Sequence, residues 1–215
     1  MGTADSVARA GLRLNERESA RITGYNSAMP AATSLAEQLL IAMPGLQDGF
    51  FDRSVSLVCQ HDEQGAMALM LNRDSEYSLG SLFAQLDLAC DDPALCDRPV
   101  LYGGPVKPER GFVLHDDGGS WDSSLQLSCG LTVSTSKDIL VALAAGNGPK
   151  RFQVLLGYSG WSANQLEAEI AENAWLHAPL SREIIFDLPP ERRWQAAAKQ
   201  LGIEVSLISN QAGHA

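Results

Sequence analysis

The chain has 215 residues, of which 45% are hydrophobic and 20% charged, and this composition predicts a sizeable core and excludes disorder along the whole chain. No apolar run approaches the roughly 18 residues that a membrane-spanning helix needs, so we expect no membrane partner. The net charge of −10 and the pI near 4.8 predict an acidic surface, which argues against direct binding to nucleic acid.

Residues 1–34 differ in composition from the rest of the chain. Four arginines recur there at a four-residue spacing, which would place them on one side of a helix. They are Arg9, Arg13, Arg17 and Arg21. A targeting or membrane-surface helix would carry such a stripe, but little apolar surface lies opposite it, so we predict a disordered extension. We expect a single folded domain at 35–203 and a C-terminal tail at 204–215.

The first half of the folded region is predicted to consist of strands joined in hairpins and one helix. The predicted elements are strands at 38–42, 54–61 and 66–71, a helix capped by Ser78, and strands at 99–102 and 111–115, with a tight turn at 107–111. The strand at 54–61 alternates in polarity, and a turn joins it to the next strand, so the two form a hairpin. Cys59 lies on the apolar side of that strand, which favours buried packing over a thiolate nucleophile.

The second half alternates strands and helices. The predicted elements are short strands at 125–129 and 131–133, a helix at 137–145, an apolar strand at 152–157, a strand at 183–186 and a helix at 190–201. Hairpins followed by alternation predict an α+β fold with a mixed sheet rather than a doubly wound one.

A glycine turn at 157–160 is predicted to lead into a strongly specified helix start. Ser162 at the N-cap and Gln165 three residues later form a capping-box pattern, and Trp161 and Leu166 are placed for a hydrophobic staple.

The residues that could bind a metal or catalyse a reaction form no complete set. His61 and His115 each end a predicted strand, where they could bind a metal or act in acid–base catalysis. No third ligand is spaced to join them, so we predict hydrogen-bonded structural histidines and no metal.

The four cysteines show neither metal-ligand spacing nor a disulfide framework. They are Cys59, Cys90, Cys96 and Cys129. With no signal peptide recognised, we expect a reducing cytoplasm. Thiol redox sensing by Cys90 and Cys96 is a further hypothesis, although the acidic residues around them oppose thiolate formation.

Seven short motifs follow one another along the folded region. They are 40–46 (LIAMPGL), 59–61 (CQH), 71–73 (LNR), 103–106 (GGPV), 111–115 (GFVLH), 156–161 (LGYSGW) and 165–169 (QLEAE). Together, and in this order, they resemble the AlgH/YqgE family of bacterial proteins over nearly the whole of 35–203. Two positions depart from the family's pattern: Asn164 stands where Gly is usual, and Asp74 stands where Pro is usual.

The resemblance implies a single cytoplasmic α+β domain whose bent mixed sheet forms a pseudo-barrel flanked by helices. It implies no established enzyme activity and no cofactor. Members are often labelled transcriptional regulators, and the acidic surface of this chain favours an indirect regulatory effect over DNA binding.

The family's polar and glycine signature supplies the candidate site. It falls on Met43, Pro44, Asn72, Arg73, Gly103, Gly104, Pro105, His115, Gly157, Trp161, Gln165 and Glu169. Many of these positions lie at strand ends or in turns, where function commonly resides. Our leading hypothesis is a non-enzymatic binding module for a small ligand or a partner protein segment. The competing structural interpretation is that these residues only shape turns and tie loops to the backbone.

The alternative function is a small-molecule hydrolase or transferase. It would use His115 or His61 as the base and Arg73 as a clamp for an anion, with the amides before Gln165 holding an oxyanion or phosphate.

Overall fold

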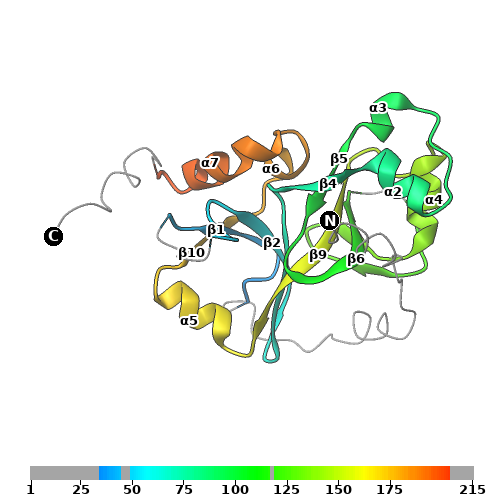
Figure 1. The fold of residues 1–215 in the computed structure, drawn as a ribbon. Coiled ribbons are helices and arrows are strands. Elements are labelled where there is room, and N and C mark those ends of the chain that lie inside the picture. Colours follow the sequence, from blue (N-terminus) through cyan, green and yellow to red (C-terminus); the bar gives the residue numbers. More distant parts are fainter. Residues whose placement is uncertain (1–33, 45–48, 117–118, 204–215) are drawn as a thin grey trace, which may run out of the picture. The chain divides into compact units, whose positions relative to one another are not determined.

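The computed structural model describes residues 34–44, 49–116 and 119–203. The predicted N-terminal extension, apart from Ser34, and the predicted C-terminal tail lie outside these residues. The described chain forms two compact units: unit 1 contains residues 75–101 and 107–157, and unit 2 contains the described residues up to 74 together with 102–106 and 158–203 (Figure 1). Each unit combines helices with antiparallel strand pairs, so the predicted α+β class is confirmed.

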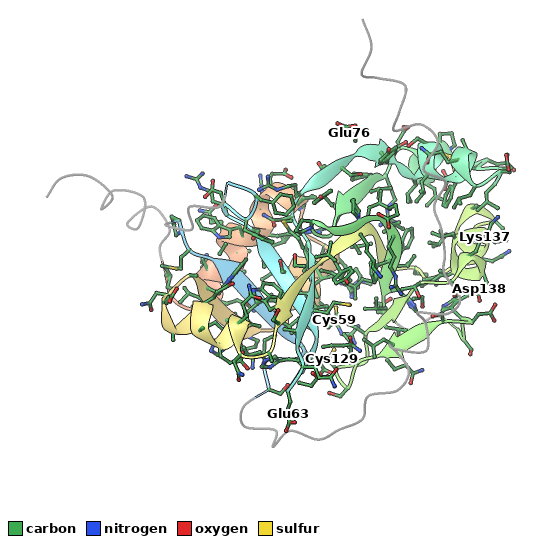
Figure 2. The ribbon with its side chains drawn as sticks, turned by 60° about the horizontal axis from the view of Figure 1, so that its bottom comes forward. Cys59, Glu63, Glu76, Cys129, Lys137 and Asp138 are labelled. Atoms are coloured by element: carbon green, nitrogen blue, oxygen red, sulfur yellow. A yellow bond between two sulfur atoms is a disulfide. The ribbon has the colours of Figure 1, made fainter. Side chains whose placement is uncertain are left out.

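Unit 2 is built on a curled antiparallel sheet. Its strands are β1 (Gln38–Ala42), β2 (Val55–Asp62), β3 (Gly65–Met70), the end of β9 (Phe152–Ser162) and β10 (Trp175–Pro179). They hydrogen-bond in the order β10-β1-β2-β3-β9. Along β1 and β2 both faces are buried, which explains why these strands are nearly continuous apolar runs. Figure 2 shows Glu63 at the exposed tip of the β2–β3 hairpin.

Helices lie on both sides of the unit 2 strands. They are α5 (Gln165–Ala171), α6 (Arg182–Phe186) and α7 (Pro190–Gln200). In Figure 1, α5 lies on one side of β1 and β10, and α6 and α7 lie on the other. The buried indole of Trp194 on α7 donates a hydrogen bond to the Ala42 carbonyl at 2.9 Å, which fixes this helix to β1.

Unit 1 is built around one apolar cluster, to which two of the three helices in its described residues contribute buried side chains. Its helices are α2 (Leu79–Gln85), α3 (Pro93–Cys96) and α4 (Lys137–Ala144). Its strands are β4 (Asp74–Ser78), β5 (Pro99–Tyr102), β6 (Val106–His115), β7 (Ser124–Gln126), β8 (Thr132–Ser134) and the first part of β9. The end residues Asp74, Tyr102 and Val106 of β4, β5 and β6 belong to unit 2. Buried side chains of α2, α4 and β9 form the core of this unit, including Phe83, Leu140 and Val154. Lys137 and Asp138 begin α4 (Figure 2).

Three local predictions were wrong for physical reasons. Residues 183–186 form part of helix α6 rather than a strand, because the Ser181 hydroxyl accepts a hydrogen bond from the Ile184 amide at 3.3 Å and starts a helix. The predicted turns at 107–111 and 157–160 lie inside the continuous strands β6 and β9. In β9 the positive φ of Gly157, 71°, accommodates the irregular backbone without ending the strand. Helix α3, in the acidic stretch before residue 98, was not predicted from the sequence.

The start of α5 is capped differently from the prediction. The N-cap is Asn164, with φ of 61°, and Ser162 belongs to β9. Half of the predicted capping box is present, because the Gln165 side-chain oxygen accepts the Ser162 N–H at 3.0 Å. Trp161 and Leu166 belong to one buried cluster, as the staple pattern predicts.

Cys90 and Cys96 form a disulfide, which corrects the prediction that the cysteines carry none. The two cysteines are six positions apart, and the turn and short helix α3 between them bring their side chains together. The spacing of the cysteines in the sequence did not reveal this turn. Among the described residues, no helix is long and apolar enough to cross a bilayer.

Candidate functional site

His61 is held at both ring nitrogens in unit 2. The side chain is buried at the end of β2, and its Nδ1 lies 2.9 Å from the Leu35 amide, which donates to it. Nε2 therefore carries the ring proton and donates to the Glu167 carboxylate at 2.9 Å. This arrangement fastens the start of the described chain to α5, and it confirms the prediction of a hydrogen-bonded histidine at a strand end.

His115 lies in a buried polar chain in unit 1. Its Nδ1 donates a hydrogen bond to the Asp116 carbonyl at 2.9 Å. In the neutral ring Nε2 is then an acceptor, and it accepts a hydrogen bond from the Ser134 hydroxyl at 2.9 Å. The Ser134 oxygen is in turn 2.8 Å from the Ser124 hydroxyl. Burial lowers the pKa of His115 from its ordinary value, an effect that Asp116 opposes through its carbonyl and its charge. The imidazole is therefore held neutral, with both nitrogens occupied.

The hydroxyl–imidazole pair of Ser134 and His115 has little space beside it. His115 is 1% exposed and Ser134 is fully buried. A cavity of about 10 Å³ lies next to Ser134, between Leu140 and Val154, and this volume suits roughly one water molecule. A substrate could not reach the hydroxyl without opening this part of unit 1.

Asn72 and Arg73 fix the turn that precedes β2. The Asn72 side-chain oxygen accepts the Val55 amide at 2.8 Å, and its amide group donates to the Arg53 carbonyl at 2.8 Å. Arg73 donates to the Asp52 carbonyl at 3.2 Å. Its guanidinium also lies 5.9 Å from the centre of the Phe50 ring, within cation–π range. Both predicted site residues therefore hold this turn, while Arg73 stays half-exposed and, among the described residues, has no carboxylate partner.

The glycine-rich motif after β5 permits a close approach of two backbones. Gly104 has a φ of 152°, and a Cβ there would lie 2.1 Å from the Tyr158 carbonyl carbon. The Gly103 carbonyl accepts the Met70 amide at 2.8 Å. Gly104 is therefore required by packing, and Pro105 follows it as an exposed residue.

Glu169 joins three predicted site residues into one cluster. One carboxylate oxygen accepts the indole N–H of both Trp161 and Trp175 at 2.8 Å. The other oxygen accepts the Gln165 amide at 2.9 Å. Trp175 is 2% exposed and was missed as a site residue, although the sequence offered it as one of four tryptophans. Both carboxylate oxygens of Glu169 accept hydrogen bonds from side chains of the protein itself, so this cluster is a rigid support.

Five aromatic side chains form a continuous row in unit 2, which we call the aromatic row. In order of contact they are Tyr102, Phe50, Phe51, Trp175 and Trp161. Neighbouring ring centres are 4.9–5.8 Å apart and the rings meet edge to face. The tryptophan end is buried, whereas Phe50, Phe51 and Tyr102 are half-buried beside Arg73. The row thus links a rigid interior to a partly exposed aromatic and cationic surface.

Met43 and Pro44 lie half-buried after β1, and the Met43 amide donates to the Ala174 carbonyl, next to Trp175. Thus ten of the twelve residues of the family signature lie in unit 2, where hydrogen bonds and ring contacts link most of them. His115 and Gly157 are the exceptions, because they belong to unit 1.

Three buried hydroxyls in unit 2 have no hydrogen-bond partner among the described residues. They belong to Ser54, Ser56 and Ser159, each no more than 1% exposed. The strand register places Ser56 opposite Leu40 and Ser159 opposite Ala68. Leu40 and Ala68 are in the cluster that packs against Trp161, Trp175 and Phe51, so these two hydroxyls face the aromatic row.

Arg193 on α7 is a buried cation that the sequence did not single out. Its guanidinium donates to the carbonyls of Leu188 and Leu71, and burial lowers its pKa to about 10. The charge of Asp74 opposes that shift. Asp74 is the position where the family usually has Pro, so here the substitution supplies a compensating charge for a buried arginine.

No cluster of three or more His, Cys, Asp or Glu side chains that could hold a metal occurs within the described ranges. The candidate site therefore offers aromatic faces, one guanidinium and hydroxyl groups.

The AlgH-like family profile matches residues 39–206 of the chain. This chain belongs to the AlgH-like family. It is 52% identical to a UPF0301 protein of Stenotrophomonas maltophilia over 182 residues, which is 85% of this chain and 97% of the relative. It is also 52% identical over 183 residues to a UPF0301 protein of Xanthomonas campestris, with the same coverage.

The solved structures agree with this assignment. The solution structure of the AlgH protein from Pseudomonas aeruginosa shares 46% identity, with a TM-score of 0.71, and covers 89% of this chain and 100% of its own. A crystal structure of a Corynebacterium diphtheriae protein has a TM-score of 0.62 at 18% identity, covering 88% of this chain and 97% of its own, and it shows the shared fold alone. The predicted family and fold are both confirmed.

Proposed function

We propose that this AlgH-like protein is a binding and regulatory module without catalysis of its own. The ligand is a small molecule, or a partner protein segment, that carries an apolar or aromatic group beside an anionic group. It binds on the half-buried end of the aromatic row, at Phe50, Phe51, Tyr102 and Arg73.

The observation that carries the proposal is the junction of aromatic faces and a guanidinium on one surface. The Arg73 guanidinium lies over Phe50 with one carbonyl as its hydrogen-bond acceptor, so most of its donors are available to an anion. Aromatic side chains and arginine are the residues most enriched at binding hot spots.

The rigidity of the buried end supports the same proposal. Glu169 holds both tryptophan indoles, and Trp175 packs edge to face against Phe51. A surface fixed in this way loses little conformational entropy when a ligand binds. The hydroxyls of Ser56 and Ser159 add hydrogen-bonding capacity behind the row.

The hydrogen-bond pattern favours binding over hydrolysis. Both ring nitrogens of His61 already have protein partners, and the Ser134 hydroxyl bound to His115 is fully buried beside space for about one water molecule, so neither histidine is poised to act on a bound substrate. A regulatory effect would then be indirect, through a bound ligand or protein, because the net charge of −10 disfavours contact with DNA.

A metabolite screen by thermal shift tests the proposal. Wild type and Arg73→Ala are screened in parallel, and each ligand-induced shift is measured from that variant's own melting temperature. Arg110→Ala is the matched control, because Arg110 also lies over a phenylalanine, Phe112, but in unit 1. We expect anionic aromatic compounds to raise the melting temperature of wild type and of the control but not of Arg73→Ala. Equal shifts in all three proteins would contradict the proposed surface.

The hydrolase alternative is favoured by one observation, the 2.9 Å contact of the Ser134 hydroxyl with His115. That geometry suits a nucleophile and its base. Labelling with a fluorophosphonate probe distinguishes the two functions. Attachment of the probe to Ser134, lost in Ser134→Ala, would support the hydrolase, whereas we expect no labelling.

A further inference from the structure

The Cys90–Cys96 disulfide closes a small ring on the surface of unit 1. The two residues are six positions apart, and both are half-buried. Cys90 follows α2 and Cys96 is the last residue of α3, so the bond joins the two ends of the turn that carries α3. Partial exposure leaves the sulfur atoms within reach of small thiols.

The two ends of this segment are anchored without the disulfide. On one side the Leu88 amide donates to the Phe83 carbonyl of α2 at 2.9 Å. On the other side the Arg98 guanidinium donates to the Phe152 carbonyl at 2.8 Å and stacks 4.0 Å above the Phe152 ring. Breaking the disulfide would therefore free the segment between these anchors while the rest of unit 1 keeps its contacts.

The freed segment would be weakly held. Helix α3 has four residues, and a single turn is marginal in water without outside support. Its position depends on close packing against α2, because a Cβ at Gly80 would lie 3.0 Å from the Cys96 Cβ. The disulfide thus holds a short element in a tight contact that its own hydrogen bonds would not maintain.

We propose that Cys90 and Cys96 form a reversible redox site whose co-reactant is a low-molecular-weight thiol–disulfide couple of the glutathione type. In reduction, a thiolate attacks one sulfur and forms a mixed disulfide, and the other cysteine leaves as a thiolate and takes up a proton. A second small thiol attacks the mixed disulfide, releasing a small disulfide and the second protein thiol. Two electrons and two protons pass to the protein. The disulfide state docks α3 on α2, and the dithiol state releases the segment 89–97 between the two anchors.

The charge around the site sets its preference among thiols. Asp91, Asp92 and Asp97 are exposed next to the two cysteines. They repel anionic glutathione, so its reaction should accelerate at least about threefold between low and high salt as their field is screened. β-Mercaptoethanol also attacks as a thiolate, but with a single negative charge against the net two of the glutathione thiolate, so its acceleration should be smaller.

The first measurement is the oxidised fraction of the full-length chain. The protein is equilibrated in glutathione buffers from the cytosolic to the secretory range, then alkylated and weighed by mass spectrometry. We expect the pair to change from dithiol to disulfide within that range. A pair that stays wholly oxidised or wholly reduced throughout would overturn the proposal.

The second measurement is hydrogen exchange of α3. In the oxidised chain the amides of Cys96 and Asp97 donate to carbonyls of the same turn at 3.0 Å. We expect these amides to exchange at least about tenfold faster after reduction and in Cys90→Ser, with α2 unchanged. Cys129→Ser is the matched control, since Cys129 lies outside the disulfide (Figure 2). Unchanged exchange after reduction would refute the release of the segment.

Discussion

Replacing Glu169 by alanine is the sharpest test of the rigid support behind the aromatic row. The carboxylate is the acceptor for two indole N–H groups, those of Trp161 and Trp175. Removing it leaves both donors without their partner in a region where water has little access, because the two indoles are 8% and 2% exposed. The substitution therefore measures what the carboxylate contributes to this cluster.

The expected loss follows from the number of donors. An unsatisfied buried donor costs about 1–3 kcal/mol, and Trp175 should incur this in full. Trp161 is slightly more exposed and should incur less, so the two together give about 3 kcal/mol. This is a substantial part of the roughly 5–15 kcal/mol by which folded domains are stable. Glu169→Gln keeps one acceptor oxygen and should lose about 1 kcal/mol.

Urea unfolding followed by circular dichroism measures these losses. Glu172→Ala is the matched control, because Glu172 is an exposed glutamate at the end of the same helix and should change stability by less than about 0.5 kcal/mol. If Glu169→Ala were as stable as this control, the indole–carboxylate bonds would not hold the tryptophans, and the rigid end of the aromatic row would be refuted.

Three further substitutions test local features of the fold. Gly104→Ala should fail to fold or lose more than about 3 kcal/mol in urea unfolding, because its Cβ would meet backbone, whereas Gly49→Ala, with open space, should melt like wild type. Asn164→Gly should preserve or raise the free energy of unfolding, and Asn164→Ala should lower it by roughly 1 kcal/mol, because φ is 61° there. Burial lowers the pKa of the His115 imidazole below its ordinary value of 6.5, so as the pH falls the unfolded chain takes up a proton at this residue before the folded chain does. The contribution of the neutral imidazole to the free energy of unfolding is therefore complete above pH 6.5 and is lost as the pH falls below it. Urea unfolding at several pH values should show this slope flattened in His115→Gln but retained in His177→Gln.

Hydrophobic pattern was enough to predict most of the fold. The strand at 38–42 and the helix at 190–201 were placed almost as observed, because their periodicity and end signals agree with their packing. Strand β10 was missed because its five residues lack a clear alternation, and their burial comes from pairing with β1 and contact with α5. Helix α6 was mistaken for a strand because a run of four apolar or charged residues fits both periods, and only the Ser181 cap decides.

The candidate site was predictable as a set of positions but not as an arrangement. The family signature included Arg73 and Glu169, yet it could not show that one oxygen of Glu169 accepts hydrogen bonds from two indoles and the other from Gln165. Phe50 and Phe51 are adjacent aromatic residues in the sequence, but their contacts with Tyr102 and Trp175 depend on long-range packing that the sequence does not show. The role of Asn164 could not be predicted from the sequence, because it depends on the backbone dihedral angle φ, which is 61° there. Its left-handed backbone suits the glycine expected from the family's pattern, and asparagine tolerates the same conformation.

The most direct test of the binding surface is a nuclear magnetic resonance titration with phenyl phosphate, a small aromatic anion. We expect the ligand-induced changes in amide chemical shift to gather at residues 50–53, 73 and 102–104. These changes should be absent in Arg73→Ala, while Arg110→Ala responds like wild type. Shifts that gather instead around His115 and Ser134, or that persist unchanged in Arg73→Ala, would contradict the claim that the aromatic row and Arg73 form the binding site.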